Sequence, residues 1–154
     1  MRYGRRSGIT RPLVQHRFHF GISLATKSGH LLPMPSDPKV FSNYFLVRHR
    51  DLNHAGTLFG GTMMAWADEL AYVAASLTYP GCDFVTKVFE TFDFISGAAQ
   101  GAIVRIDAKI VSKGRSSVRV EVSGTWAVTG QPIFSTHAVM VNARNGKSAP
   151  IPEG

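Results

Sequence analysis

Residues 60–77 read GGTMMAWADELAYVAASL, which is the strongest helix candidate in the chain. Its alanine, methionine, leucine and tryptophan residues favour a helix over 62–77, with the two glycines at its start and Pro80-Gly81 as its stop. The stretch is apolar on nearly every side and carries few polar residues, Asp68 and Glu69 among them. A helix of this kind must be covered on most faces, which one curved sheet cannot do completely. A second subunit is therefore expected to cover the remainder.

Strand patterns surround this helix, one before it and four after it. Two of them show the two-residue alternation of a half-buried strand, and turn residues separate them. The predicted strands span residues 40–49, 84–95, 102–112, 117–128 and 132–143. One long helix with a run of antiparallel strands makes an α+β domain, which we expect over residues 37–154.

Length and composition exclude several classes of protein. The 154 residues suit one domain, and 44% hydrophobic with 18% charged residues is ordinary for a globular chain. No stretch reaches the roughly 18 apolar residues that a membrane span needs. The lone Cys82 excludes an intramolecular disulfide and fits a reducing compartment. A cytoplasmic protein is expected.

Six of the seven net positive charges belong to the first 36 residues, which carry six basic side chains and no acidic one. The rest of the chain is nearly neutral, so nucleic acid is not an expected partner. Residues 1–36 form a basic leader whose composition fits a mitochondrial transit peptide. It fits equally a disordered extension, or an upstream start with Met34 as the true one.

The candidate chemistry lies between Asn53 and Asp68. Gly60 and Gly61 at a helix start leave backbone N–H groups open to a ligand, at the positive end of the helix dipole, where an oxyanion would be stabilised. Asp68 lies seven residues beyond Gly61, about two turns on and on nearly the same face. Taken singly, each residue also has a structural explanation. Asp68 could cap a loop or pair with a basic residue, the two glycines could allow close packing of the helix start, and Asn53 could form an Asx-turn. Their combination favours a functional site.

The pattern N-x-x-G-x-L-F-G-G-x-x-M-x-W-x-D over residues 53–68 resembles the signature of hotdog-fold acyl-CoA thioesterases. These belong to the 4-hydroxybenzoyl-CoA thioesterase superfamily, and the bacterial acyl-CoA hydrolase branch is most similar. The resemblance implies a long central helix wrapped by a five-stranded antiparallel sheet. It implies hydrolysis of an acyl-CoA to free acid and CoA, with no cofactor besides the CoA of the substrate. It also implies a homodimer as the minimal unit, within a tetramer or hexamer, with active sites between subunits.

The resemblance assigns catalytic roles to four residues. Asp68 is expected to act as general base or nucleophile, and Asn53 of the partner subunit to orient water or the carbonyl. The amides of Gly60 and Gly61 would form the oxyanion site. His54 next to Asn53 either lines the site or is a solvated turn residue.

Further residues are expected to contact the substrate. Phe59 would lie beside the acyl-CoA, and a turn between two strands would hold the CoA phosphates or pantetheine. That turn consists of Lys113, Gly114, Arg115, Ser116 and Ser117, with charge from its lysine and arginine. The acyl preference would depend on Met63, Met64, Trp66, Phe89 and Phe92. Residues 95–101 depart from the aromatic-arginine-proline turn of relatives, so CoA contacts or acyl specificity are expected to differ there.

Two other functions stay open. An enoyl-thioester dehydratase of the same fold would need a catalytic histidine, and His49 or His54 with Asp68 is the candidate pairing. A non-catalytic acyl-CoA-binding module would not require a buried carboxylate. No histidine pair in the body has metal-ligand spacing, so no metal site is expected.

Overall fold

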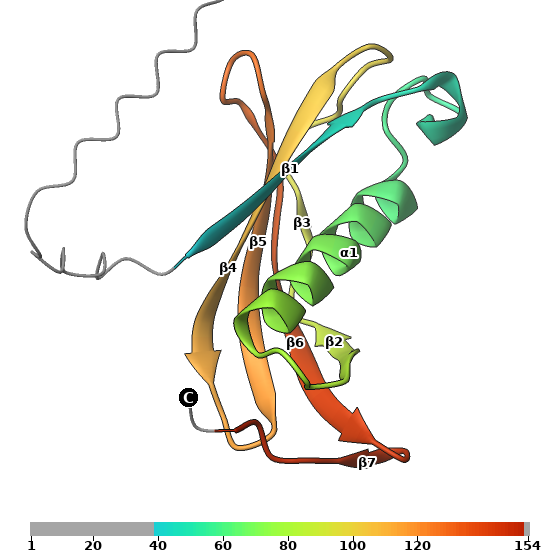
Figure 1. Ribbon diagram of the computed structural model, residues 1–154. Coiled ribbons are helices and arrows are strands. Elements are labelled where there is room, and N and C mark those ends of the chain that lie inside the picture. Colours follow the sequence, from blue (N-terminus) through green and yellow to red (C-terminus); the bar gives the residue numbers. More distant parts are fainter. Residues whose placement is uncertain (1–38, 153–154) are drawn as a thin grey trace, which may run out of the picture. The chain divides into compact units, whose positions relative to one another are not determined.

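The computed structural model describes residues 39–152, in which one helix lies against one face of an antiparallel sheet (Figure 1). The helix, α1, spans Gly60–Thr78, and a short 3-10 helix, η1 (His49–Asp51), precedes it. The strands are β1 (Val40–Leu46), β2 (Phe84–Phe89), β3 (Asp93–Phe94), β4 (Ile103–Lys113), β5 (Ser117–Trp126), β6 (Pro132–Arg144) and β7 (Lys147–Ser148). The predicted α+β class with one long helix is confirmed. No helix in this part of the chain is long and apolar enough to cross a membrane.

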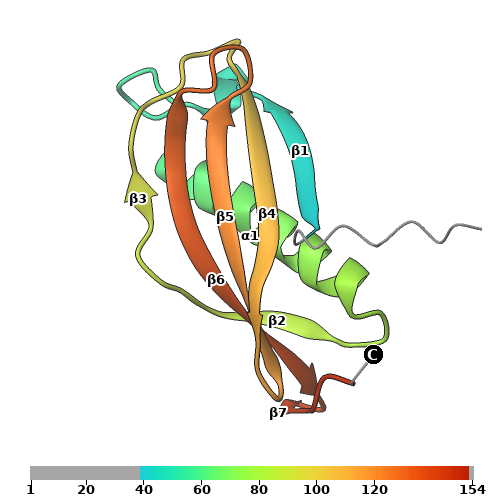
Figure 2. The ribbon, with the colours of Figure 1, turned by 90° about the vertical axis from the view of Figure 1, so that its left-hand side faces the viewer.

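The sheet runs in the order β1-β4-β5-β6-β2, and every strand on this path contacts α1. The short strands β3 and β7 both pair with β6, off the main path. Figure 2 shows the opposite face of the sheet, with α1 behind the strands. The five strands of the path form the wrapping sheet that the hotdog resemblance implies, and β1 and β2 are its two edges.

Small side chains bring α1 close to the sheet. The side of α1 that faces the strands carries four alanines with 0% exposure: Ala67, Ala71, Ala74 and Ala75. Nearer the helix start, Trp66 stacks on Phe45 of β1 with ring centroids 4.5 Å apart. The other side of α1 is uncovered within one chain, where Met64, Tyr72 and Leu77 are 37%, 50% and 63% exposed. One sheet therefore leaves part of the apolar surface of α1 uncovered.

The prediction of one continuous strand over residues 84–95 was wrong. Between Thr86 and Val88, β2 has one residue more than the facing stretch of β6, which forms a β-bulge. Three residues lie between Phe89 and Asp93, but only two lie between their partners Ala138 and Ser135 on β6, so there is a second surplus residue. The two surplus residues, one on each side of Phe89, interrupt the ladder, although the Glu90 N–H still donates to His137 O at 2.9 Å. Each also reverses which side chains face the helix.

The observed bounds of the first strand and of the helix differ from the predicted ones by a few residues. The first strand ends at Leu46 rather than at 49, because Arg48 opens η1 and donates its N–H to Asp51 Oδ2 at 2.8 Å. The helix begins at Gly60 and ends at Thr78, so both glycines are helical residues. The predicted leader and the domain boundary at 36/37 lie outside the described residues.

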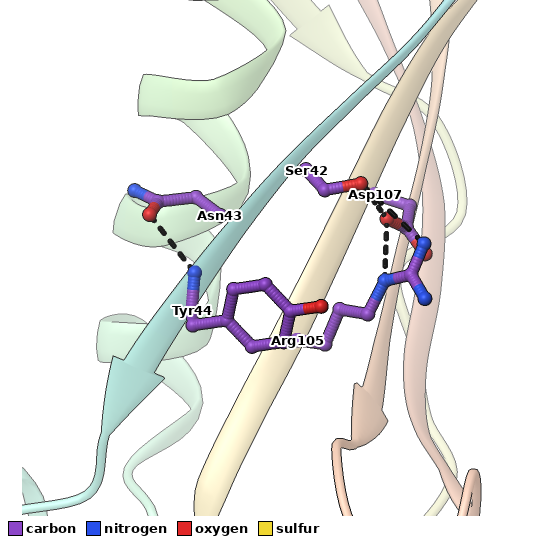
Figure 3. A network of polar contacts seen from close by, with 5 residues as sticks. All are labelled: Ser42, Asn43, Tyr44, Arg105 and Asp107. Carbon is purple, nitrogen blue, oxygen red and sulfur yellow. Dashed lines mark hydrogen bonds and ion pairs between the residues drawn. The ribbon is translucent and has the colours of Figure 1, made fainter. Parts of the chain in front are cut away.

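Side chains on the far face of the sheet tie edge strand β1 to β4 (Figure 3). Arg105 Nε donates to Asp107 Oδ1 at 2.9 Å, and the Ser42 hydroxyl of β1 donates to the same oxygen. The hydrogen bond that Arg105 donates to Asp107 raises the pKa of the Arg105 guanidinium. On β1 itself, the Tyr44 N–H donates to Asn43 Oδ1 at 2.9 Å. The polar network holds β1 in place without contributing to the core.

Candidate active site

The start of α1 presents two free backbone donors. Gly60 and Gly61 are its first residues, and within residues 39–152 neither N–H donates a hydrogen bond. The next two amides, of Thr62 and Met63, both donate to Phe59 O, at 3.0 and 3.1 Å. No side chain caps the helix. The two glycine amides therefore remain available to a carbonyl oxygen or an oxyanion.

Gly60 lines a cavity of about 410 Å³ that also holds Asn53, whereas the neighbouring Gly61 is exposed. The cavity is lined by Asn53, Thr57, Leu58, Gly60, Met63, Phe94, Ile95, Ser96 and Gly97. Asn53 Oδ1 accepts from the N–H groups of Ala55 and Thr57 at 2.9 and 3.2 Å, and Nδ2 donates to Thr57 Oγ1 at 3.0 Å. Asn53 thus builds its own Asx-turn, and one Nδ2 hydrogen remains for a ligand. Asn53 and Gly60 of the same chain therefore line one cavity.

Asp68 lies elsewhere. It is half-buried on α1, and its Oδ1 accepts a hydrogen bond from the Thr86 hydroxyl of β2. Eight residues of helix separate it from Gly60, about 12 Å along the axis, and it does not line the cavity. One chain therefore does not bring Asp68 together with Asn53. Nothing in the sequence pointed to Thr86, because a threonine in a half-buried strand is an ordinary β residue.

The remaining residues near the helix start are exposed. His54 lies in the exposed turn, and Phe59 is 54% exposed; neither lines the cavity. No hydrogen bond joins His49 or His54 to Asp68, whose side-chain partner is Thr86. Among the described residues, no three His, Cys, Asp or Glu side chains converge as metal ligands would.

The predicted CoA turn is the hairpin between β4 and β5, at the other end of the sheet from the start of α1 (Figure 1). Lys113, Gly114 and Arg115 line a hollow of about 650 Å³ together with residues 150–152. Lys113 Nζ donates to Pro152 O at 3.1 Å, and Gly114 N–H donates to Ser117 O at 2.8 Å. The Ser116 carbonyl accepts from the backbone of Asn142 at 2.9 Å. Within one chain this turn and the Gly60 cavity are separate.

Of the five side chains expected to shape the acyl pocket, only Met63 lines the cavity. Trp66 is occupied by its stack on Phe45, and Met64 is on the uncovered side of α1. The cavity wall comes instead from residues 94–97, whose contribution depends on the bulges after β2.

Comparison with known proteins places this arrangement in a family. Residues 55–126 match the model of the thioesterase superfamily. A solved hexameric acyl-CoA thioesterase is 30% identical, with a TM-score of 0.65, over 73% of this chain and 75% of that one. The chain belongs to the thioesterase superfamily. The acyl-CoA hydrolase of Staphylococcus aureus, solved with butyryl coenzyme A and coenzyme A, is 28% identical with a TM-score of 0.66, over 73% of this chain and 69% of that one.

A curated member of this superfamily is also similar to the chain. It is an uncharacterized acyl-CoA thioester hydrolase of Bacillus subtilis, 27% identical over 107 residues, which make up 66% of this chain and 62% of that protein. The chain thus spans less than two thirds of that relative. The thioesterase-superfamily match includes Gly60, Gly61, Asp68 and the 113–117 turn, but begins after Asn53. The family and the hotdog fold expected from the motif at 53–68 are confirmed.

Proposed function

We propose that the chain hydrolyses an acyl-CoA thioester to a free acid and CoA. The proposal is carried by the two unbonded amides of Gly60 and Gly61, which begin the helix that bears Asp68, with Gly60 lining a cavity. A thioester carbonyl bound there would be polarised, and each N–H would stabilise the oxyanion by about 3 kcal/mol. The acyl-CoA hydrolases and thioesterases similar to this chain support the same reaction class. The reaction requires no cofactor beyond the substrate.

Asp68 is the proposed reactive carboxylate. The Thr86 hydroxyl holds Oδ1, and no hydrogen bond to Oδ2 occurs within the described residues. The held oxygen orients the carboxylate, while Oδ2 is free to accept a proton from water or to attack the carbonyl carbon. Both routes end in release of the CoA thiol.

A second copy is needed to complete the proposed site. The roughly 12 Å of helix between Gly60 and Asp68 is too long for one thioester to contact both. Asp68 lies beside edge strand β2 and close to the uncovered side of α1. We therefore propose a homodimer in which Asp68 of one copy meets Asn53 and the glycine amides of the other, within a tetramer or hexamer. The hexameric thioesterase among the similar structures supports the larger assembly.

Variants of the Staphylococcus aureus hydrolase support the choice of residues. Its solved structures include alanine replacements of an asparagine, an aspartate and a threonine. The asparagine and aspartate are fifteen positions apart in that protein, as Asn53 and Asp68 are here. The threonine follows the aspartate by seventeen positions, against eighteen for Thr86.

We propose that the 113–117 turn binds the CoA phosphates. Lys113 and Arg115 are exposed, and within residues 39–152 neither pairs with a carboxylate. The hollow of about 650 Å³ that they line is open to solvent, and their two positive charges would attract a phosphate group. Because this turn is far from the cavity in one chain, its CoA would belong to an active site shared with another copy. His54 and Phe59 would lie along the same substrate. A cytoplasmic location remains a prediction.

Release of free thiol from acyl-CoAs tests the proposal, with Asp68→Asn compared against Glu69→Gln. Glu69 is the next residue on α1 and is exposed, which makes it a matched control. Asp68→Asn is expected to lose at least about 100-fold in kcat with an unchanged circular dichroism spectrum. Glu69→Gln is expected to keep the activity. Equal turnover by both variants would remove Asp68 from the mechanism, and tight acyl-CoA binding without release would indicate a binding module.

A further inference from the structure

Two phenylalanine rings lie against the glycines at the helix start, Phe94 at Gly60 and Phe59 at Gly61. A Cβ built on Gly60 would lie 3.0 Å from Cε1 of Phe94, and one built on Gly61 would lie 3.1 Å from Cδ1 of Phe59. Both values are tighter than ordinary van der Waals contact. The absence of a side chain at each glycine therefore lets a ring lie directly against the helix start. A carbonyl held by these amides would have one substituent directed toward each ring.

The two rings differ in their surroundings. Phe94 lines the cavity of about 410 Å³, whereas Phe59 does not. Leu58, Met63 and Ile95 add further apolar wall on the Phe94 side. Of the two substituents of a thioester carbonyl, the acyl chain is apolar and the CoA arm is polar. The Phe94 side therefore suits the acyl chain, and the open Phe59 side suits the CoA arm.

Other aromatic rings stand behind Phe94 and close that side of the cavity. The ring centroid of Phe92 lies 4.7 Å from that of Phe94, 5.1 Å from that of Phe134 and 6.0 Å from that of Phe89. Phe134 is 1% exposed, so it is fixed in the core. Phe94, in contrast, is 54% exposed and pairs with the sheet only through the two-residue strand β3. It is the outermost ring of the cluster and the one that a ligand would meet.

We propose that Phe94 determines the length of acyl chain that this protein accepts. The inference rests on the proposed thioesterase function and deepens it. The ring forms a wall on the acyl side of the cavity, and its removal exposes the ring of Phe92 behind it to the acyl chain. A longer chain then fits in place of the ring. A larger ring at 94 shortens the site.

The experiment compares kcat/KM for butyryl-CoA and decanoyl-CoA in the full chain and in Phe94→Ala, Phe94→Leu and Phe94→Trp. The ratio of decanoyl to butyryl values is expected to rise about tenfold or more in Phe94→Ala, and less in Phe94→Leu, since one buried methylene is worth about tenfold or more in discrimination. Phe94→Trp is expected to lower the ratio. Tyr44→Ala is the matched control, because Tyr44 is an aromatic residue of similar exposure, 59%, on the far face of the sheet.

The outcomes separate this inference from the proposed function. A ratio that stays constant in all three Phe94 variants, while the unaltered chain hydrolyses both substrates, overturns the role of Phe94 and leaves the thioesterase function intact. A ratio that Tyr44→Ala changes as much as Phe94→Leu does also overturns it. Failure of the unaltered chain to release CoA from either substrate overturns the proposed function and this inference together. If Phe94→Ala does not fold, the leucine and tryptophan variants carry the test.

Discussion

Replacing Gly124 of β5 with alanine would put a methyl group where the ring of Phe134 lies. The new Cβ would be 2.6 Å from Cδ1 and 3.0 Å from Cζ of that ring, against 3.4–4 Å in an ordinary contact. The ring must therefore move by about an ångström in a close-packed core. Phe134 is 1% exposed and stacks on Phe92 at 5.1 Å, so it cannot move without its neighbour.

Overpacking of a core by one methyl group costs about 1–3 kcal/mol. Because two stacked rings must shift together, we expect the upper part of this range, about 2–3 kcal/mol. For a chain of this size, such a loss lowers Tm by roughly 4–12 °C. The activity on long acyl chains is expected to change as well, since Phe92 connects Phe134 to Phe94.

Thermal unfolding at matched protein concentration measures the effect, because Tm of an oligomer depends on concentration. Ser123→Ala is the control: this neighbour in β5 lies on the far face of the sheet, and its replacement is expected to change stability by less than about 0.5 kcal/mol. Trimming the ring with Phe134→Leu should make the alanine at 124 less costly than it is alone. A Gly124→Ala protein that melts within about 1 °C of the unaltered chain would refute the close packing of this cluster.

Three further outcomes are expected. Thr86→Val removes the hydroxyl that donates to Asp68, and kcat should fall about 10- to 100-fold with Tm nearly unchanged. Arg119 holds the pKa of Glu90 below its usual value of 4.5 by hydrogen bonding to it, so the stability from this pair is present above that pH and is lost as pH falls through the lowered pKa. Glu90→Gln should therefore lower Tm slightly at neutral pH and not in acid, where a persisting difference would contradict the pairing. Asn142→Ala breaks hydrogen bonds to one backbone N–H and two carbonyls and should cost about 2–3 kcal/mol in urea unfolding, with faster proteolysis of the C-terminal tail.

The helix-start motif could be read from the sequence because its elements are local. Gly60 and Gly61 at the start of an apolar run predict free amides, and the structure has them. Asn53 and Gly60 share a cavity because only seven residues separate them. Asp68 is different: its hydroxyl partner Thr86 is eighteen residues away on another element, and no pattern in the sequence links the two.

Local propensity was sufficient to predict the helix and its surplus of apolar surface. The alternation of apolar residues, together with the turn residues, predicted the five strands that cover the helix. The acyl-side wall was not predictable in this way. It depends on two surplus residues after Thr86: the first reverses the alternation and brings Phe89 into the cluster, and the second restores it for Phe92 and Phe94. A bulge is a property of two paired strands rather than of one segment, because it exists only relative to the register of β6. For this reason the aromatic cluster beside the Gly60 cavity emerged only from the folded chain.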